Sequence, residues 1–168
     1  MNLLFKKLFN LMFLLALALL SVSGFAADSI EKPETKSALT ADLLTYDRLY
    51  TGEDGHTHFD QTTVNYTLIK YAKDTPAVWV ESGGPRPAKN IQFVGSPTGW
   101  DASKNHPAPR RQFFIILSGI VAFTASDGET RHYEAGDVLL LEDVSGIGHG
   151  SYTVSQTACL IAAIPLAD

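Results

Sequence analysis

The chain has 168 residues, with 13 lysines and arginines against 18 aspartates and glutamates. This length suits one domain with a sizeable core, and the excess of acids argues against nucleic acid and anionic membrane surfaces as partners. Cys159 is the only cysteine, so an internal disulfide is excluded, and its apolar neighbours at 158–164 predict a buried thiol rather than a nucleophile.

The first 26 residues have the pattern of a secretory signal peptide. Lys6 and Lys7 precede an apolar segment from Leu8 to Leu20, and small residues end at Ala26. The apolar run is shorter than the roughly 20 residues that span a bilayer, so we expect cleavage after Ala26 rather than an uncleaved anchor. Cleavage removes two of the 13 basic residues and leaves 11 against 18 acids, a net charge of −7. The sequence therefore predicts a periplasmic or secreted protein without stable membrane association.

Two further segments complete the predicted domain organisation. Polar and charged residues at 27–38 predict a flexible leader, and the domain is expected to span residues 39–168. At its start, the helical spacing of Leu39, Leu43 and Leu44 favours a short helix within residues 38–50, with a first strand as the alternative.

From Thr62 onward the spacing of apolar residues becomes typical of strands. Short apolar or alternating runs are separated by glycine and proline turns. The predicted strands are residues 62–70, 78–80, 91–94, 113–117, 120–125, 130–133, 138–141, 151–154 and 158–164. About nine short strands with almost no helix predict an all-β sandwich or barrel. Glycines at 146, 148 and 150 surround His149, and they favour a loop that presents this side chain to a cavity.

Residues 51–164 resemble the cupins, which are small double-stranded β-helix barrels, also called jelly rolls. His106-x-Ala108, three residues, Gln112, six residues and Gly119 match the spacing of the first cupin motif, and Gly136 with His149 matches the second loosely. The strings HPAPRRQ at 106–112 and GDVLLLED at 136–143, followed by GxGH at 146–149, are similar to a subgroup of small single-domain cupins. The resemblance implies a single-domain cupin jelly-roll barrel and leads us to expect a homodimer.

The resemblance also implies a set of metal ligands. In metal-binding cupins two histidines and a glutamate of the first motif and a histidine of the second hold a divalent metal. The corresponding residues here are His106, Ala108, Gln112 and His149, so His106, Gln112 and His149 are the candidate ligands. Because two histidines and a neutral amide bind first-row metals poorly, we expect a weakly bound divalent metal or none. His56 and His58 offer further imidazoles, although their neighbours at 52–55 indicate a surface loop.

Strand parity predicts what else faces the barrel interior. If His106 points inward, alternation places Ala108, Arg110 and Gln112 on the same face and Arg111 outside. An inward guanidinium needs a carboxylate. Arg110 is therefore expected either to pair with Glu142 or Asp143 or to bind the carboxylate of a ligand. The predicted ligand-binding residues are His106, Arg110, Gln112, Glu142 and Trp100.

Two functions of different class follow from this pocket. One is a protein that binds a small anionic, carboxylate-bearing molecule. The other is an enzyme in which Arg110 orients the substrate and His149 or His106 acts as general acid or base. Its alternative form is a metal-dependent oxygenase, isomerase or lyase centred on His106 and His149. The sequence does not decide whether the protein is an enzyme.

Overall fold

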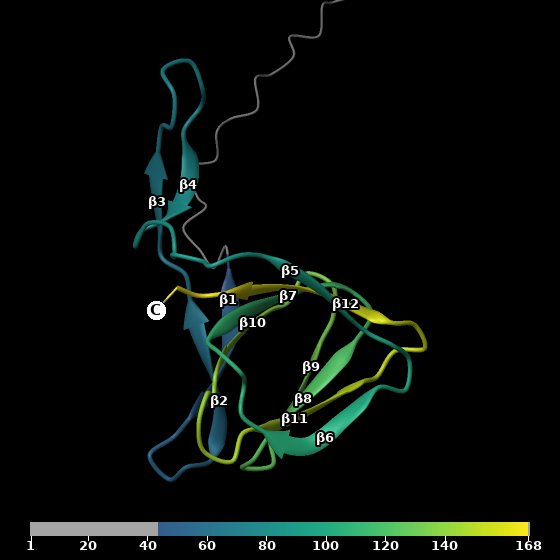
Figure 1. Ribbon diagram of the computed structural model, residues 1–168. Coiled ribbons are helices and arrows are strands. Elements are labelled where there is room, and N and C mark those ends of the chain that lie inside the picture. The colour runs from purple at the N-terminus through teal and green to yellow at the C-terminus, as the bar shows by residue number, and fades with distance from the viewer. Residues whose placement is uncertain (1–43, 168) are drawn as a thin grey trace, which may run out of the picture. The chain divides into compact units, whose positions relative to one another are not determined.

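The computed structural model describes residues 44–167, which form twelve β-strands and contain no helix (Figure 1). Among these residues nothing resembles an apolar helix long enough to cross a membrane. The predicted signal peptide at 1–26, the leader at 27–38 and the domain start at Leu39 lie outside the described residues, so all three stay predictions.

Ten of the twelve strands form two facing sheets (Figure 1). The larger sheet has the order β2 (Thr57–Thr63), β1 (Thr45–Thr51), β10 (Val138–Glu142), β7 (Gln112–Ser118), β12 (Cys159–Pro165) and β5 (Gln92–Ser96). The smaller sheet has the order β6 (Asp101–His106), β11 (His149–Thr153), β8 (Val121–Ala125) and β9 (Thr130–Tyr133). The remaining strands, β3 (Tyr66–Ile69) and β4 (Val78–Glu81), form a separate hairpin.

The core lies between the inner faces of the two sheets. Leu49, Leu139 and Ile116 enter it from the larger sheet, and Val121 and Phe123 enter it from the smaller one. Along β7 the side chains alternate, so Ile116 is fully buried while Leu117 is exposed. Burying these side chains from both sheets is what holds the sheets face to face. The predicted all-β class with a jelly-roll arrangement is therefore confirmed.

The helix favoured within residues 38–50 is wrong over its described part, and the alternative, a first strand, is confirmed there. Residues 45–51 form β1, which pairs in parallel with β10 and antiparallel with β2. Tyr46 and Leu49 are buried by this pairing. The hydrogen bonds and burial supplied by two neighbouring strands outweigh the local spacing of the leucines.

Two strand predictions also need correction. The single strand expected at 62–70 is divided between the end of β2 and β3, with Val64 buried between them and Leu68 about half exposed. Strand β6 was not predicted, because Asp101–His106 is polar and its side chains are mostly exposed. This strand matters for function because it ends at His106.

Candidate functional site

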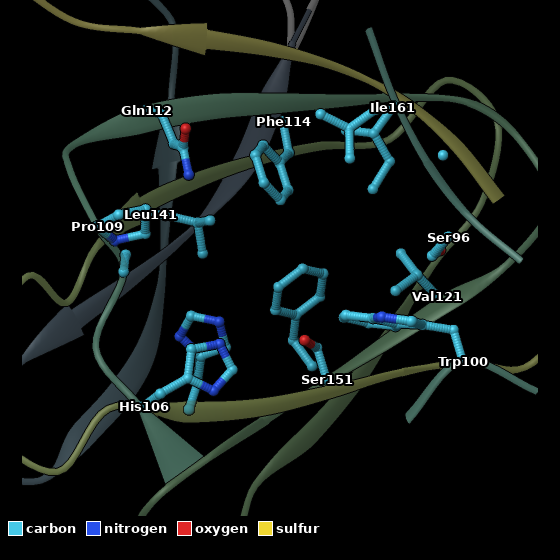
Figure 2. A pocket seen from close by; sticks show the side chains of 15 residues that line it. Ser96, Trp100, His106, Pro109, Gln112, Phe114, Val121, Leu141, Ser151 and Ile161 are labelled. Atoms are coloured by element: carbon cyan, nitrogen blue, oxygen red, sulfur yellow. The ribbon is translucent and has the colours of Figure 1, made fainter. Parts of the chain in front are cut away.

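A cavity of about 280 Å³ opens between the two sheets. Most of its lining is apolar or aromatic, and the charged side chains of lysine, arginine, aspartate and glutamate are missing from it. The lining residues are Val94, Gly95, Ser96, Trp100, His106, Ala108, Pro109, Gln112, Phe114, Val121, Phe123, Leu141, His149, Ser151 and Ile161. Figure 2 shows His106, Pro109 and Gln112 at one end of this cavity, with Trp100, Val121 and Ser96 at the other. The polar end of the cavity therefore contains the imidazoles of His106 and His149 and the side-chain amide of Gln112.

Pairing between β6 and β11 brings His106 and His149 together. The two residues are register partners, and their ring centroids lie 5.0 Å apart. The backbones approach closely here, because a Cβ on Gly148 would lie 2.1 Å from the carbonyl carbon of His106. Gly148 also has a φ of 79°, which only glycine adopts without strain. Only glycine at position 148 therefore allows the strands to approach closely enough for the two imidazoles to lie side by side.

His149 is oriented by a buried carboxylate. Its Nδ1 lies 2.6 Å from Oδ2 of Asp143, and both side chains are almost fully enclosed. The backbone carbonyl of Asp143 also accepts a hydrogen bond of 2.9 Å from the amide of Ala108. Because Nδ1 faces this carboxylate, Nε2 is the ring nitrogen left to face the cavity. His106 is held similarly, with Nδ1 2.9 Å from the carbonyl oxygen of Lys104.

Gln112 completes the polar end of the cavity. Its side chain is 7% exposed, and its amide has no hydrogen-bond partner among residues 44–167. Buried amides are normally satisfied, because burying one without a hydrogen bond costs about 1–3 kcal/mol. An amide left in this state beside a cavity is suited to a partner that enters the cavity.

Aromatic rings form much of the remaining wall. The ring of Phe123 lies 5.3 Å from that of His149 and 6.1 Å from that of Phe114. Trp100 lines the far end and is 38% exposed. Flat apolar surfaces of this kind favour a flat or compact apolar group as their neighbour.

Comparison with known proteins places these residues in a family. The model of the EutQ-like cupin domain matches residues 103–159, which include His106, Gln112, Asp143 and His149. Residues 103–159 therefore form a cupin domain of the EutQ-like type. No curated protein matches the sequence.

Three similar solved structures have low sequence identity to this cupin. A conserved protein of unknown function from Streptococcus pyogenes is 24% identical with a TM-score of 0.36, and the match covers 46% of this chain and 65% of that one, just under two thirds. The Cnp3 cupin domain of Schizosaccharomyces pombe is 13% identical with a TM-score of 0.39, over 76% of this chain and 86% of that one. The dTDP-6-deoxy-D-glucose-3,5-epimerase RmlC of Legionella pneumophila is 10% identical with a TM-score of 0.37, over 73% of each chain. None of these similarities assigns an activity to this cupin.

The structure does not bring Arg110 into the cavity, so the predicted convergence of Arg110 with His106, Gln112 and His149 is wrong. Arg110 is exposed and is absent from the lining, whereas His106, Ala108, Gln112 and His149 all contribute to it. Alternation of side chains would place Arg110 inside only if a continuous strand ran from His106 to Gln112. Pro109 and Arg110 instead form a bend between β6 and β7, because proline lacks the backbone donor that a strand needs.

Glu142 also lies outside the cavity, contrary to the prediction. Its carboxylate pairs with Arg111 at 3.1 Å and with Arg48 at 3.4 Å. Side chains alternate along β10, so Leu141 lines the cavity while Glu142 turns to the other face of the sheet. Trp100 lies at the cavity as predicted, and the outward position of Arg111 is confirmed.

The loop predicted around His149 is wrong at its last residues, because His149 begins strand β11. Sequence reasoning also assigned Asp143 only as a partner for Arg110, and missed its bond to His149. A turn containing Gly146 and Gly148, both with positive φ, returns the chain so that Asp143 and His149 meet. In the sequence, the features that indicate this bond are the glycines before His149 and the acidic residue at the end of β10.

The donor set of this cupin does not fit a tightly held divalent metal. The three candidate ligands are two imidazoles and a neutral amide, and none carries a negative charge. Nowhere in residues 44–167 do three or more histidine, cysteine, aspartate or glutamate side chains form a metal-binding group. His56 and His58 do not line the cavity. The chemistry proposed below therefore uses only the side chains of the chain.

Cys159 takes no part in this site. It is fully buried on β12, and burial raises the pKa of its thiol. A thiol that stays protonated and is inaccessible is not a nucleophile, which agrees with the expectation from the sequence.

Proposed function

We propose that this cupin binds a small molecule with an apolar body and one polar end inside its barrel. The observation that carries the proposal is the side-chain amide of Gln112, which has no hydrogen-bond partner among residues 44–167 and lies beside two imidazoles in a mostly apolar cavity. At about 280 Å³, the cavity is near the lower end of ligand sites, which range from about 300 to 1,000 Å³. The ligand is accordingly smaller than a typical drug molecule.

The polar end of the ligand is matched by hydrogen-bonding groups rather than by a fixed positive charge. Nε2 of His149 accepts a hydrogen bond from a hydroxyl or carboxylic acid, and the amide of Gln112 both donates and accepts. The carboxylate anion expected from the sequence depended on Arg110, which lies outside the cavity. We therefore propose an oxygen-bearing end, namely a hydroxyl, carbonyl or carboxyl group.

Proton transfer is the second candidate function, favoured by the bond between Asp143 and His149. A carboxylate that accepts the Nδ1 proton lets Nε2 take a proton from a bound molecule, and it then stabilises the imidazolium that forms. The rings of Phe123 and His106 lie beside this imidazole, 5.3 and 5.0 Å from it between centroids. The class of reaction that suits such a group is proton abstraction next to a carbonyl, with His149 as the base.

Secretion and homodimer formation are also proposed, on the sequence alone. The N-terminal residue of the protein recovered from the periplasm or the medium tests the first, and retained Met1 in a membrane pellet would contradict it. Sedimentation mass tests the second, and a mass of one chain would contradict it.

Thermal unfolding with a panel of small molecules tests the binding proposal. Benzoate, phenylacetate, benzaldehyde, benzyl alcohol and acetate provide apolar bodies and polar ends in different combinations. A molecule that binds only the folded state stabilises it by about 2.7 kcal/mol at one hundred times its dissociation constant. We expect at least one aromatic member to raise Tm while acetate, which lacks the apolar body, does not.

Two variants make this experiment specific for the cavity. His149→Gln removes the imidazole at the polar end and should abolish the ligand-induced rise, whereas Arg110→Ala alters an exposed residue and should retain it. A panel without any stabilising member, or a rise that survives in His149→Gln, would contradict the proposal.

A further inference from the structure

We propose that His58, held between Asp54 and Asp127, is a pH-sensitive clamp that fixes the 144–148 loop beside His106 and His149. The inference rests on the proposed function only in that the loop borders the proposed ligand site. The clamp itself comprises these three side chains and lies outside the cavity.

The clamp joins two turns that are far apart in the sequence. Nδ1 of His58 lies 2.7 Å from Oδ2 of Asp127, and Nε2 lies 3.1 Å from Oδ1 of Asp54. Asp54 belongs to the turn at residues 52–56 between β1 and β2, and Asp127 belongs to the turn between β8 and β9. Both ring nitrogens must carry a proton to donate to both carboxylates. Only the imidazolium form of His58 therefore makes the two bonds together.

Other bonds support the same junction between the turns. The amide of Thr57 donates to Oγ of Ser126 at 2.7 Å, and Nδ1 of His56 lies 3.2 Å from the carbonyl oxygen of Ser126. These bonds hold the base of the 52–56 turn at any protonation state of His58. Backbone bonds from Gly52 to His56 and from Gly55 to Gly52 close the turn itself. Loss of the His58 bonds should consequently loosen the attachment of this turn to Asp127 without unfolding the turn or the strands.

The tip of the 52–56 turn supports the 144–148 loop. The carbonyl oxygen of Gly55 accepts a hydrogen bond of 3.1 Å from the amide of Ile147. Gly146 packs so closely that a Cβ there would lie 2.5 Å from the same oxygen. The next glycine, Gly148, is in contact with the backbone of His106. Movement of Gly55 is thus transmitted through three consecutive residues to the polar end of the cavity.

The charges around His58 favour the imidazolium. The carboxylates of Asp54 and Asp127 face His58 directly. The ring of Tyr50 lies 5.9 Å from the imidazole between centroids, and the guanidinium of Arg48 stacks over that ring. In the same turn, the backbone amide of His56 donates a hydrogen bond to Asp54. The hydrogen bonds to Asp54 and then Asp127 raise the pKa of His58, and the bond to His58 lowers the pKa of Asp54. The folded-state pKa of His58 exceeds its unfolded value of about 6.5, so the clamp is complete below that pH and opens as pH rises through the raised value.

Hydrogen exchange of the Ile147 amide tests the clamp without any ligand. Protection factors, which correct for the intrinsic pH dependence of exchange, are measured by NMR on the whole protein from about pH 5.5 to about pH 8.5. The exchange rate of the His149 Nδ1 proton is followed in the same samples, and the titration of His58 is read from its ring resonances.

We expect Ile147 protection to fall as His58 loses its proton, and the His149 proton to exchange faster over the same range. Asp127→Asn keeps an oxygen that can accept from His58 but removes the charge that helps to raise the pKa of His58, so the fall in Ile147 protection should move to lower pH than in the wild type. His58→Gln should lose the pH dependence. His132→Gln replaces an exposed histidine on β9 and should behave as the wild type.

Protection that stays constant while His58 titrates, or a wild-type pH dependence in His58→Gln or Asp127→Asn, would overturn the clamp. If His58→Gln does not fold, Asp127→Asn decides alone. Failure of every molecule in the thermal panel would count against the proposed function and leave these exchange results unaffected, so the two failures are distinguishable.

Discussion

Replacing Gln112 by leucine should make the protein more stable while removing ligand recognition. The amide of Gln112 is 7% exposed and unpaired among the described residues, and leaving an amide in this state costs about 1–3 kcal/mol. A leucine of similar size would pack against Phe114 and Leu141 in the cavity wall. Because the amide borders a cavity that admits water, we take the lower end of the range. We expect a gain of about 1 kcal/mol in the free energy of unfolding, or about 4 °C in Tm.

Urea unfolding of Gln112→Leu and of a matched control measures this effect. Gln92 on β5 is exposed, so Gln92→Leu makes the same chemical change at the surface and should alter stability by less than about 0.5 kcal/mol. Any stabilising molecule found in the thermal panel should lose its effect in Gln112→Leu and keep it in Gln92→Leu. Destabilisation of Gln112→Leu by more than about 1 kcal/mol would refute the reasoning, since it would mean that the amide is satisfied in the folded protein.

Three other substitutions separate structural from recognition roles. Asp143→Asn removes the charge that accepts the Nδ1 proton of His149, and urea unfolding should show a loss of about 1–3 kcal/mol; unchanged stability would argue against the buried bond. Gly148→Ala introduces a Cβ 2.1 Å from the carbonyl carbon of His106 at a φ of 79°, so a loss of at least about 3 kcal/mol is expected in the same assay, and a smaller one would contradict the close approach. Arg110→Ala should change the free energy of unfolding by less than about 0.5 kcal/mol, and a larger loss would mean that its side chain has an internal partner.

Strands with strong local patterns could be predicted from the sequence. Thr130–Tyr133 was predicted with the bounds that the structure gives to β9, and the apolar run at 138–141 became β10 with one residue added. The second segment is a continuous apolar run, and glycines at 128 and 136 flank the two segments. The family resemblance added the jelly-roll connectivity, which such patterns do not contain.

The sequence offers strand β1 only as the alternative to a helix, because the partners of this strand are remote. Leu49 pairs with Phe59 on one side and Leu141 on the other. The second contact joins residues more than ninety positions apart in the sequence. Its burial therefore depends on the complete sheet, and local spacing of leucines carried the wrong signal.

The candidate site was predictable where strand parity held and not where the chain bends. His106, Ala108 and Gln112 face the cavity as alternation predicts, but Pro109 interrupts the strand and turns Arg110 outward. The bond between Asp143 and His149 depends on a turn whose glycines have positive φ. The glycines were visible in the sequence, whereas the direction in which the turn returns the chain was not.

The central claim is that a small molecule binds with its polar end at His106 and His149, and NMR of protein labelled with ¹⁵N-histidine tests it most directly. A stabilising member of the thermal panel is titrated while the ring resonances of His106, His149 and the exposed His132 are followed. We predict saturable shifts at Nε2 of His149 and at His106, with His132 unchanged. Binding that shifts His132 and leaves His149 unmoved would contradict the account.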